Sequence, residues 1–391
     1  MTRTDSQSTT LRTHRCGALR AADVGTAVRL GGWVHGKRNL GGLVFLDLRD
    51  RDGIVQVSFD PATVDDATRD LAASVGKESV VLVEGVVAAR PPEGRNPELA
   101  TGEVEVKARS LRVAGPAVTP AIPVARVKGE VLPSEEQRLR HRYLDLRRPE
   151  LQRNLVLRHR LMQATRGYLC EHGYLEIETP ILTKPTPEGA RDYLVPSRVH
   201  PGAFYALPQS PQLYKQLLMV SGFDRYFQIA RCFRDEDLRA DRQPEFTQID
   251  IEASFIAAED IYALAEGLLV ALWREGGRDI TAPFPRMRHA EAVERYGTDR
   301  PDLRYGLELF DATDVFRNTD FGIARAAIDA GGRVRGLRVP GGAALSRKQV
   351  DELEVLAKGA GAGGLLRLKR EAGQLTGPVA KYLAPGAADH L

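Results

Sequence analysis

Cysteine is scarce in this sequence, and its three thiols, Cys16, Cys170 and Cys232, lie far apart without the short spacings of a metal site. The chain also lacks any apolar run near the roughly 20 residues of a membrane helix. Its polar start, MTRTDSQSTT, lacks the apolar core of a signal peptide. These absences argue against a disulfide scaffold and a membrane span, and they predict a cytoplasmic protein with reduced, buried thiols.

A strong net charge is absent too, because 55 basic residues face 52 acidic ones and leave only +3. Such a balance does not by itself indicate a nucleic-acid-binding protein, so any basic surface must be local. With 391 residues, 43% of them hydrophobic, the chain can bury a sizeable core divided among about two or three domains.

The first domain, residues 1–113, contains short apolar strands separated by turn signals, with one helix near residues 65–75. The predicted strands are AVRLGGWV, LVFLDLRD, IVQVSF, VVLVEGVVAA and VEVKARSLRV. Asp52 and Gly53 form a hairpin signal between the second and third of them. The pattern predicts a small closed β-barrel, either of the oligonucleotide-binding (OB) kind or of another kind.

A linker follows over residues 114–135, which contain four prolines between Gly115 and Pro133 and show no periodicity. Residues 136–308 then alternate helices and strands, and residues 309–391 read as a small α+β module rich in glycine and arginine. Helices are predicted at the positions listed next. They span 151–172, 211–222 with Ser210 as N-cap and Pro211 as first residue, 260–277, and 346–358 with Ser346 as N-cap.

Two strands, 225–235 and 245–255, form a predicted antiparallel hairpin with a charged loop. Alternation puts Gln248, Asp250 and Glu252 on one face of the second strand, and Arg234 of the first strand shares that surface. This polar face is either a solvated sheet surface or a platform for a charged ligand. Arginine can grip a phosphate while carboxylates receive an ammonium group, which favours a polyphosphate together with an amino acid.

The wording of several segments carries a family resemblance. FRDEDLRADRQPEFTQID resembles the motif 2 hairpin of class II aminoacyl-tRNA synthetases, in the form found in bacterial aspartyl-tRNA synthetases. GYLEIETPIL is similar to motif 1, and TPEGARDYLVPSR and FYALPQSPQLYKQLLM resemble further segments of the same enzymes. The resemblance implies a multidomain α+β protein: an OB-fold barrel, an antiparallel catalytic sheet flanked by helices, and the start of a small α+β insertion domain.

By this resemblance the chain is an ATP-dependent aspartate–tRNA ligase. Arg234 would hold the ATP α-phosphate and the aspartyl carboxylate, with Glu236 and Gln243 on the nucleotide side. The aspartate α-carboxylate attacks the α-phosphate in line, pyrophosphate leaves, and the terminal adenosine of tRNA then takes the aspartyl group. Positioning and charge stabilisation would supply the catalysis.

The same resemblance assigns the aspartate pocket. Gln212 and Lys215 would face the amino acid, and Lys215 would supply the positive charge that selects a β-carboxylate. Glu188 would close over the substrate ammonium with the help of Asp250. Without the family context, Lys215 reads equally as a solvated residue of a helix.

In the barrel, Phe45 and Gln56 match positions that recognise the anticodon in this family, and Arg38 and Arg90 are candidates to contact tRNA phosphates. The alternatives are a core phenylalanine and two solvated arginines. The partners implied are tRNA(Asp) and also tRNA(Asn), which some members charge; Leu40 favours the tRNA(Asp)-specific type. Residues Tyr174–Leu182 would form a homodimer interface.

Part of the family pattern has no counterpart in these residues. We find no segment like motif 3 and none like the family's acidic Mg²⁺ ligands, so no metal ligand is assigned. We therefore expect an incomplete catalytic sheet and little or no aminoacylation by this chain alone. Three rivals remain: an asparaginyl- or lysyl-tRNA synthetase, a non-enzymatic tRNA-binding relative, and an ammonia-dependent asparagine synthetase, which lacks such a barrel.

Overall fold

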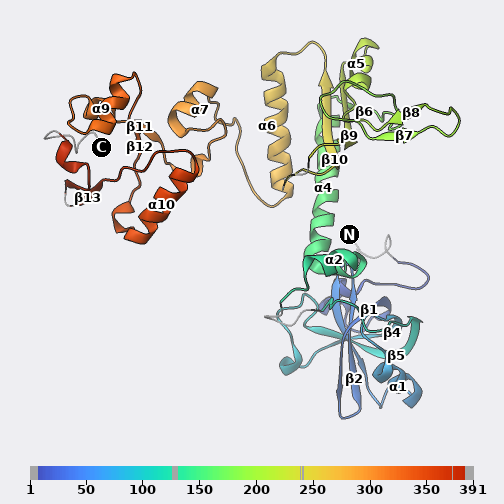
Figure 1. The fold of residues 1–391 in the computed structure, drawn as a ribbon. Helices are drawn as coiled ribbons and strands as arrows, with labels where there is room; N and C mark the ends of the chain where they lie inside the picture. The colour runs from blue at the N-terminus through green and yellow to red at the C-terminus, as the bar shows by residue number, and fades with distance from the viewer. Residues whose placement is uncertain (1–7, 126–130, 238, 240–241, 372, 384–391) are drawn as a thin grey trace. The chain divides into compact units, whose positions relative to one another are not determined.

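The computed structural model describes residues 8–125, 131–237, 239, 242–371 and 373–383. The chain divides into two compact units, Met1–Ala282 and Pro283–Leu391. The first holds the barrel and the catalytic-type sheet, and the second holds the small α+β module (Figure 1). Among the described helices, none combines the length and apolar character that a membrane crossing requires.

The predicted barrel is confirmed. Its five strands close in the order β1-β2-β3-β5-β4, with β3 and β5 parallel and the other pairs antiparallel. The strands are β1 (Ala27–Leu40), β2 (Leu43–Asp50), β3 (Gly53–Phe59), β4 (Val80–Ala89) and β5 (Val104–Gly115). Helix α1 (Asp66–Ser74) lies between β3 and β4 and begins where the Asp65 carboxylate accepts a hydrogen bond from Thr68 N. Closure leaves the barrel without the free strand edges of an open sheet.

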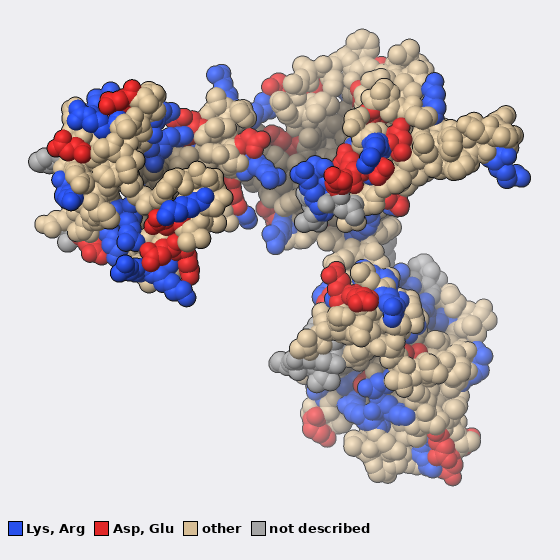
Figure 2. Space-filling model, viewed as in Figure 1, with Lys and Arg blue, Asp and Glu red and all other residues tan. Residues whose placement is uncertain are grey.

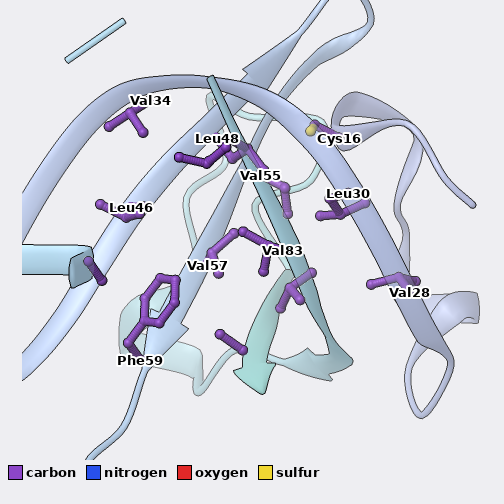
Figure 3. Close-up of a cluster of buried hydrophobic side chains, with 14 of the residues drawn as sticks. Cys16, Val28, Leu30, Val34, Leu46, Leu48, Val55, Val57, Phe59 and Val83 are labelled. Carbon is purple, nitrogen blue, oxygen red and sulfur yellow. The ribbon is translucent and has the colours of Figure 1, made fainter. Parts of the chain in front are cut away.

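Alternate residues of the strands fill the barrel, as Figure 3 shows for ten labelled side chains that converge on the interior. Leu46 and Leu48 of β2 and Val55 and Val57 of β3 have no exposed surface. Complete burial of such side chains stabilises the fold by about 1.5–3 kcal/mol each. The Cys16 thiol belongs to this core, and burial raises its pKa well above the ordinary value.

The hairpin turn between β2 and β3 lies one residue earlier than predicted. Asp50 pairs with Gly53, so Arg51 and Asp52 form the turn and Gly53 starts β3 at φ +145°. The Asp50 carboxylate holds the turn by accepting from Asp52 N at 2.9 Å and from Cys16 N at 2.7 Å. Because Gly53 carries no side chain, the segment at Cys16 can pack closely against the turn.

Beyond the barrel, the linker packs on the following helices through Ile122 and Val124, which form a small core with Leu144. Helices α2 (Glu135–Arg140) and α3 (Arg142–Asp145) precede the long α4 (Pro149–Glu171). Helix α4 begins at a proline, whose missing N–H costs nothing in the first turn, and Gly173 follows its end at φ +79°. The helix predicted over 151–172 is therefore present, with small shifts at both ends.

The catalytic-type sheet has the order β10-β9-β6 among the described strands. These are β6 (Leu175–Glu176), β9 (Arg225–Phe233) and β10 (Glu245–Ala253), followed by α6 (Ala258–Glu275). The core beneath the sheet joins Leu169 of α4, Tyr174, Phe227 and Leu264 of α6. Helices α4 and α6 approach closely, because the Tyr168 hydroxyl lies where a side chain on Gly267 would be.

Two local predictions in this region need correction. The strand expected over residues 174–182 is paired only at Leu175 and Glu176, because Pro180 has no N–H to extend the pairing. Helix α5 (Gln212–Val220) has Pro211 rather than Ser210 as its N-cap. Ser210 still accepts a hydrogen bond from Gln212 N at 3.0 Å. A short hairpin, β7 (Leu194–Pro196) with β8 (Phe204–Ala206), precedes this helix.

The second unit starts earlier in the chain than the boundary predicted at 308/309. Its elements are α7 (His289–Tyr296), β11 (Leu309–Asp311), α8 (Thr313–Phe316), α9 (Gly322–Asp329), β12 (Arg335–Leu337), α10 (Arg347–Gly359), β13 (Lys369–Glu371) and β14 (Gln374–Thr376). The Arg333 guanidinium bridges Glu294 of α7 at 2.7 Å and Asp311 of β11 at 2.6 Å. This bridge attaches α7 to the unit, and the Ser346 cap predicted for α10 is confirmed.

Candidate active site and RNA-binding face

The polar sides of β9 and β10 form one continuous floor, as the alternation predicted. Gln228 lies opposite Asp250, and Cys232 lies opposite Phe246. Directly opposed residues of an antiparallel pair share a face, so the even-numbered side chains of both strands point to the same side. The Cys232 thiol, donating to Gln248 Oε1 at 3.3 Å, confirms that arrangement.

Lys215 of α5 covers this floor with a buried ion pair. Its ammonium group lies 2.7 Å from Asp250 Oδ1 and 3.4 Å from Glu252 Oε2. The Asp250 side chain is only 2% exposed, and among the described residues its Oδ2 accepts no hydrogen bond. Burial, followed by the neighbouring Asp250 charge, raises the pKa of the Tyr226 hydroxyl well above its ordinary value. The negative charge of Asp250 is therefore concentrated in a dry, ordered place.

Glu188 reaches the same region from the loop after Thr186. Its Oε2 accepts a hydrogen bond from Ser210 Oγ at 2.7 Å, and its Oε1 accepts from Thr186 Oγ1 at 3.3 Å. Ser210 Oγ also accepts from the backbone N–H of Gln212, whose own side chain is half-buried at the start of α5. Glu188 is thus oriented by the start of the helix that carries Lys215.

The sequence gave no sign of the residue that holds this loop in place. Gln209 is 2% exposed and spends its whole amide on the loop. Its Nε2 donates to Asp192 Oδ1 at 2.5 Å and to Ala190 O at 2.9 Å, while its Oε1 accepts from Ala190 N at 3.0 Å. A glutamine between two prolines carries no pattern that predicts burial, so only the fold reveals this role.

Four charged residues converge on the thiol of Cys232. Burial raises the pKa of this thiol to about 11. The charges of Arg234 and Lys215 oppose that rise, while Asp250 and Glu188 add to it. One small region therefore feels two cations and two carboxylates, which is the mixture that an amino acid joined to a phosphate requires.

The remaining nucleotide-side residues lie at the loop end of the hairpin. Arg234 stacks over Phe246, with Cζ 4.9 Å from the ring centroid, and none of the described carboxylates lies within ion-pair distance of it. Glu236 is exposed and pairs with Arg242 at 3.2 Å, and Gln243 is exposed. The structure thus brings Arg234 to the floor but leaves Glu236 and Gln243 at its solvent edge.

The described residues offer no group of three or more histidine, cysteine, aspartate or glutamate side chains that could hold a metal ion. A Mg²⁺ site fixed by the protein alone does not fit them. We therefore assign no step of the reaction to Mg²⁺.

Three of the four predicted anticodon residues meet on the outside of the barrel. The Arg38 guanidinium lies 5.8 Å from the Phe45 ring centroid and donates to Gln56 Oε1 at 2.9 Å. Gln56 Nε2 in turn donates to Glu105 Oε2 at 2.8 Å. The Phe45 ring is half-buried rather than part of the core, so one ring face can stack on a base. Figure 2 shows basic side chains gathered on the barrel face turned to the viewer.

Arg90 differs from the solvated arginine considered above. It is 6% exposed, its Nε donates to Val104 O at 2.8 Å, and its Nη1 donates to Gly94 O at 3.3 Å. Burial lowers its pKa, and Glu105 opposes that shift. Arg90 therefore supports the backbone beside the Gln56–Glu105 pair and presents little surface to a phosphate.

Comparisons with known families agree with these two sites. Residues 134–352 match the family described as tRNA synthetases class II (D, K and N). Residues 28–114 match the OB-fold nucleic acid binding domain, and residues 324–391 match the GAD domain. The catalytic match covers more than half of the 391 residues.

Individual relatives carry names of one kind. The chain is 51% identical over 97% of its length to an aspartate–tRNA(Asp/Asn) ligase of Caldanaerobacter subterraneus subsp. tengcongensis, and covers 64% of it. It is 53% identical over 95% of its length to an aspartate–tRNA ligase of Bacillus licheniformis, and covers 63% of it. The chain thus spans less than two thirds of the length of these curated relatives.

A solved structure gives the same fold. The asparaginyl-tRNA synthetase of Pyrococcus horikoshii, complexed with asparaginyl-adenylate, aligns with a TM-score of 0.59 and 28% identity. The alignment covers 67% of this chain and 57% of that one. Together with the barrel, the hairpin floor and the family match over residues 134–352, this places the chain in the class II tRNA synthetases of the D, K and N type.

Proposed function

We propose that the chain belongs to an aspartate–tRNA ligase that activates L-aspartate with ATP and transfers it to the 3′ end of tRNA. The observation that carries the proposal is the convergence of Arg234, Lys215, Asp250 and Glu188 around Cys232. The names and identities of the relatives support aspartate as the amino acid. Because the chain spans about 63% of those relatives, the complete reaction is proposed rather than assigned.

The charges of the floor match the groups of aspartate. The buried carboxylate of Asp250 and the oriented carboxylate of Glu188 are acceptors for the substrate ammonium. Lys215 is the cation for the β-carboxylate, which would share the ammonium with Asp250 and Glu252. Half-buried Gln212 flanks this pocket at the start of α5. Asparagine, which has no second carboxylate, would leave Lys215 without an added anion, and this difference supplies the selectivity.

Arg234 serves the reacting centre. Its guanidinium, stacked on Phe246, can donate to the α-phosphate and to the attacking α-carboxylate, and it stabilises negative charge as pyrophosphate leaves. Glu236 and Gln243 at the edge of the floor would contact the nucleotide. In the second step a terminal ribose hydroxyl of tRNA attacks the aspartyl carbonyl and AMP departs. Mg²⁺ accompanies ATP in this proposal without a protein-only site.

The barrel would bind the anticodon of tRNA(Asp), and tRNA(Asn) as a second substrate. Phe45 would stack on an unpaired base, Gln56 would hydrogen-bond a base edge, and Arg38 would contact phosphate. Arg90, which the sequence suggested as a phosphate contact, would act by holding Gly94 and Val104 beside this surface.

We also propose a cytoplasmic homodimer formed through Tyr174–Leu182. Leu175, Ile181 and Leu182 expose 54%, 44% and 55% of their surface, although all three are apolar. An apolar strip of this kind is typical of an interface between copies. Tyr174 itself is buried in its own core, so the strip begins at Leu175. Light scattering coupled to size exclusion tests the dimer, and a monomer at micromolar concentration would argue against it.

The aspartate proposal is tested by calorimetric binding of two non-hydrolysable sulfamoyl adenosines, one carrying aspartate and one asparagine. The aspartyl compound should bind more tightly, and Lys215→Met should remove most of that preference. Gln216→Ala, an exposed change on the same helix, is the matched control. Aspartate-dependent exchange of pyrophosphate into ATP then reports the chemistry. Equal binding of both compounds to the folded chain would refute aspartate selectivity.

A non-enzymatic tRNA-binding protein is the second candidate, and the complete, closed barrel favours it. Binding of an anticodon stem-loop by a chain that binds neither sulfamoyl compound would support this alternative. Binding of both the RNA and the aspartyl compound would support the ligase.

A further inference from the structure

Glu78 of the barrel is an unusual residue. It is 6% exposed and has φ +65°, a conformation that costs a residue with a side chain on the order of 1 kcal/mol. The Arg49 guanidinium grips its carboxylate with two parallel hydrogen bonds of 2.9 and 2.7 Å. Its backbone N–H donates to Val34 O at 2.7 Å. Backbone and side chain are thus both fixed by the barrel.

The same carboxylate also binds a residue from outside the barrel. Arg147, between α3 and α4, donates from Nη1 to Glu78 Oε2 at 2.8 Å, and its guanidinium lies 5.3 Å from the Trp33 ring centroid. Glu78 Oε2 therefore receives Arg49 from the barrel and Arg147 from the segment that leads into the catalytic region. Neither function proposed above uses this contact.

The segment that carries Arg147 is rigid and continuous with α4. Asp145 has no exposed surface and pairs with Arg142 at 2.9 Å and with Arg148 at 3.1 Å. Leu144 packs on the linker through Ile122 and Val124. Helix α4 then starts at Pro149. The position of Arg147 thus fixes where α4 begins and in which direction it leaves the barrel.

Side-chain packing does not fix that direction over most of the boundary. A groove of about 1160 Å³ separates the barrel turns near Asp52 and Leu99 from the first turns of α4 around Arg153. A solvent-filled groove offers no close-packed contact that would resist tilting. The Glu78–Arg147 pair is buried on the Glu78 side and directional, so it resists tilting better than a solvated ion pair.

We propose that Glu78 is a positioning residue that couples the barrel to α4, so that RNA held on the barrel reaches the catalytic floor at a fixed distance and direction. The RNA part of this inference rests on the proposed tRNA function; the geometric part does not. Arg49 fixes Glu78, Glu78 fixes Arg147, and Arg147 fixes the start of α4.

The geometric part is tested by pulsed electron–electron distance measurement on the full chain. Nitroxide labels are attached to native Cys170, exposed on α4, and to Ser74→Cys, exposed on α1 of the barrel; Cys16 and Cys232 are buried. Labelled chains are diluted with unlabelled ones so that distances between copies do not contribute. Glu78→Gln and Arg147→Gln should each broaden the distance distribution, whereas Asp66→Asn, which removes an exposed ion pair of α1, should not.

Arg147→Gln is the decisive variant, because it leaves the buried Arg49–Glu78 pair and hence the barrel intact. An unchanged distribution in a folded Arg147→Gln chain would overturn the coupling. A broadened distribution in both variants and a narrow one in the control would support it.

The functional part compares two RNAs on the same variants. Arg147→Gln should bind an isolated anticodon stem-loop as the original chain does, but bind a full tRNA(Asp) transcript about three- to tenfold more weakly. Equal affinity of both chains for the full transcript would contradict the coupling. If the original chain binds no stem-loop, the proposed tRNA function fails instead, while the distance measurement still decides the geometry.

Discussion

The ammonium group of Lys215 lies 2.7 Å from Asp250 Oδ1, and the side chains are only 11% and 2% exposed. Removing two charges from water is expensive, and their mutual attraction offsets that cost only when the geometry is good. The second oxygen of Asp250 has no hydrogen-bond donor among the described residues, so one acceptor stays directed at the floor. The pair therefore holds a charge in place for a ligand as well as supporting the fold.

Removing one member of the pair should be much worse than removing both charges. Lys215→Met leaves the Asp250 carboxylate buried without its cation and should lower the free energy of unfolding by about 3 kcal/mol. The double variant Lys215→Met/Asp250→Asn should lose less than the sum of the single changes. Urea unfolding at neutral pH measures all four chains, and additive losses would show that the two groups do not interact.

Loss of the Gln209 amide should loosen the loop that carries Glu188. Gln209→Ala leaves three hydrogen bonds to Ala190 and Asp192 unmade and should cost about 1–3 kcal/mol, most of it locally. Trypsin should then cut after Arg191 several times faster, as followed by mass spectrometry. Gln216→Ala is the surface control on α5, and equal cleavage rates in both variants would contradict the assigned role.

The Phe45 ring should contribute to RNA binding by stacking. Phe45→Ala should weaken binding of the anticodon stem-loop by about 1–3 kcal/mol, while Phe45→Tyr, which keeps the ring, should bind nearly normally. Fluorescence anisotropy at fixed salt measures both. Equal weakening by the two substitutions would show that stacking is not the contact that Phe45 makes.

Arg90 should affect the barrel's stability before it affects RNA binding. Arg90→Met removes the donors to Val104 O and Gly94 O and should cost about 2 kcal/mol of unfolding free energy. Arg38→Met, at an exposed site, should leave stability within about 0.5 kcal/mol and weaken RNA binding instead. Thermal unfolding combined with the anisotropy assay separates the two behaviours.

Acid should destabilise the barrel through His35 and Glu78. Burial and then the Arg49 charge lower the pKa of His35, whose Nδ1 lies 2.6 Å from Arg49 Nη1. The unfolded chain therefore takes up a proton near pH 6.5, while folded His35 resists it, so stability falls as pH drops below that value.

Glu78 acts in the same direction at lower pH. Burial raises the pKa of Glu78, but the hydrogen bonds and charges of Arg49 and Arg147 outweigh it and leave the pKa below 4.5. Its contribution is present above that ordinary value and is lost as pH falls through the lower folded one. Urea unfolding between about pH 7 and pH 4 should show a steady loss, and His35→Gln should remove the part near pH 6.

The sequence by itself determined the local structure of this protein. Alternation with a period of two placed the barrel strands and the polar face of β10, because a strand turns successive side chains to opposite sides. Ser346 marked a helix start because a side-chain oxygen can accept the free N–H groups there. The match over residues 134–352 agrees with the family that the motif wording indicated.

Tertiary structure decided which charges meet. Lys215 read equally as a solvated residue until α5 was seen to lie over β10, and Arg90 read as a surface cation until burial placed it against two carbonyls. Gln209 and Glu78 left no trace in any local pattern, because burial and pairing depend on residues distant in the chain. Periodicity follows from the geometry of one segment, whereas a buried charge is tolerated only where a partner from another segment compensates it.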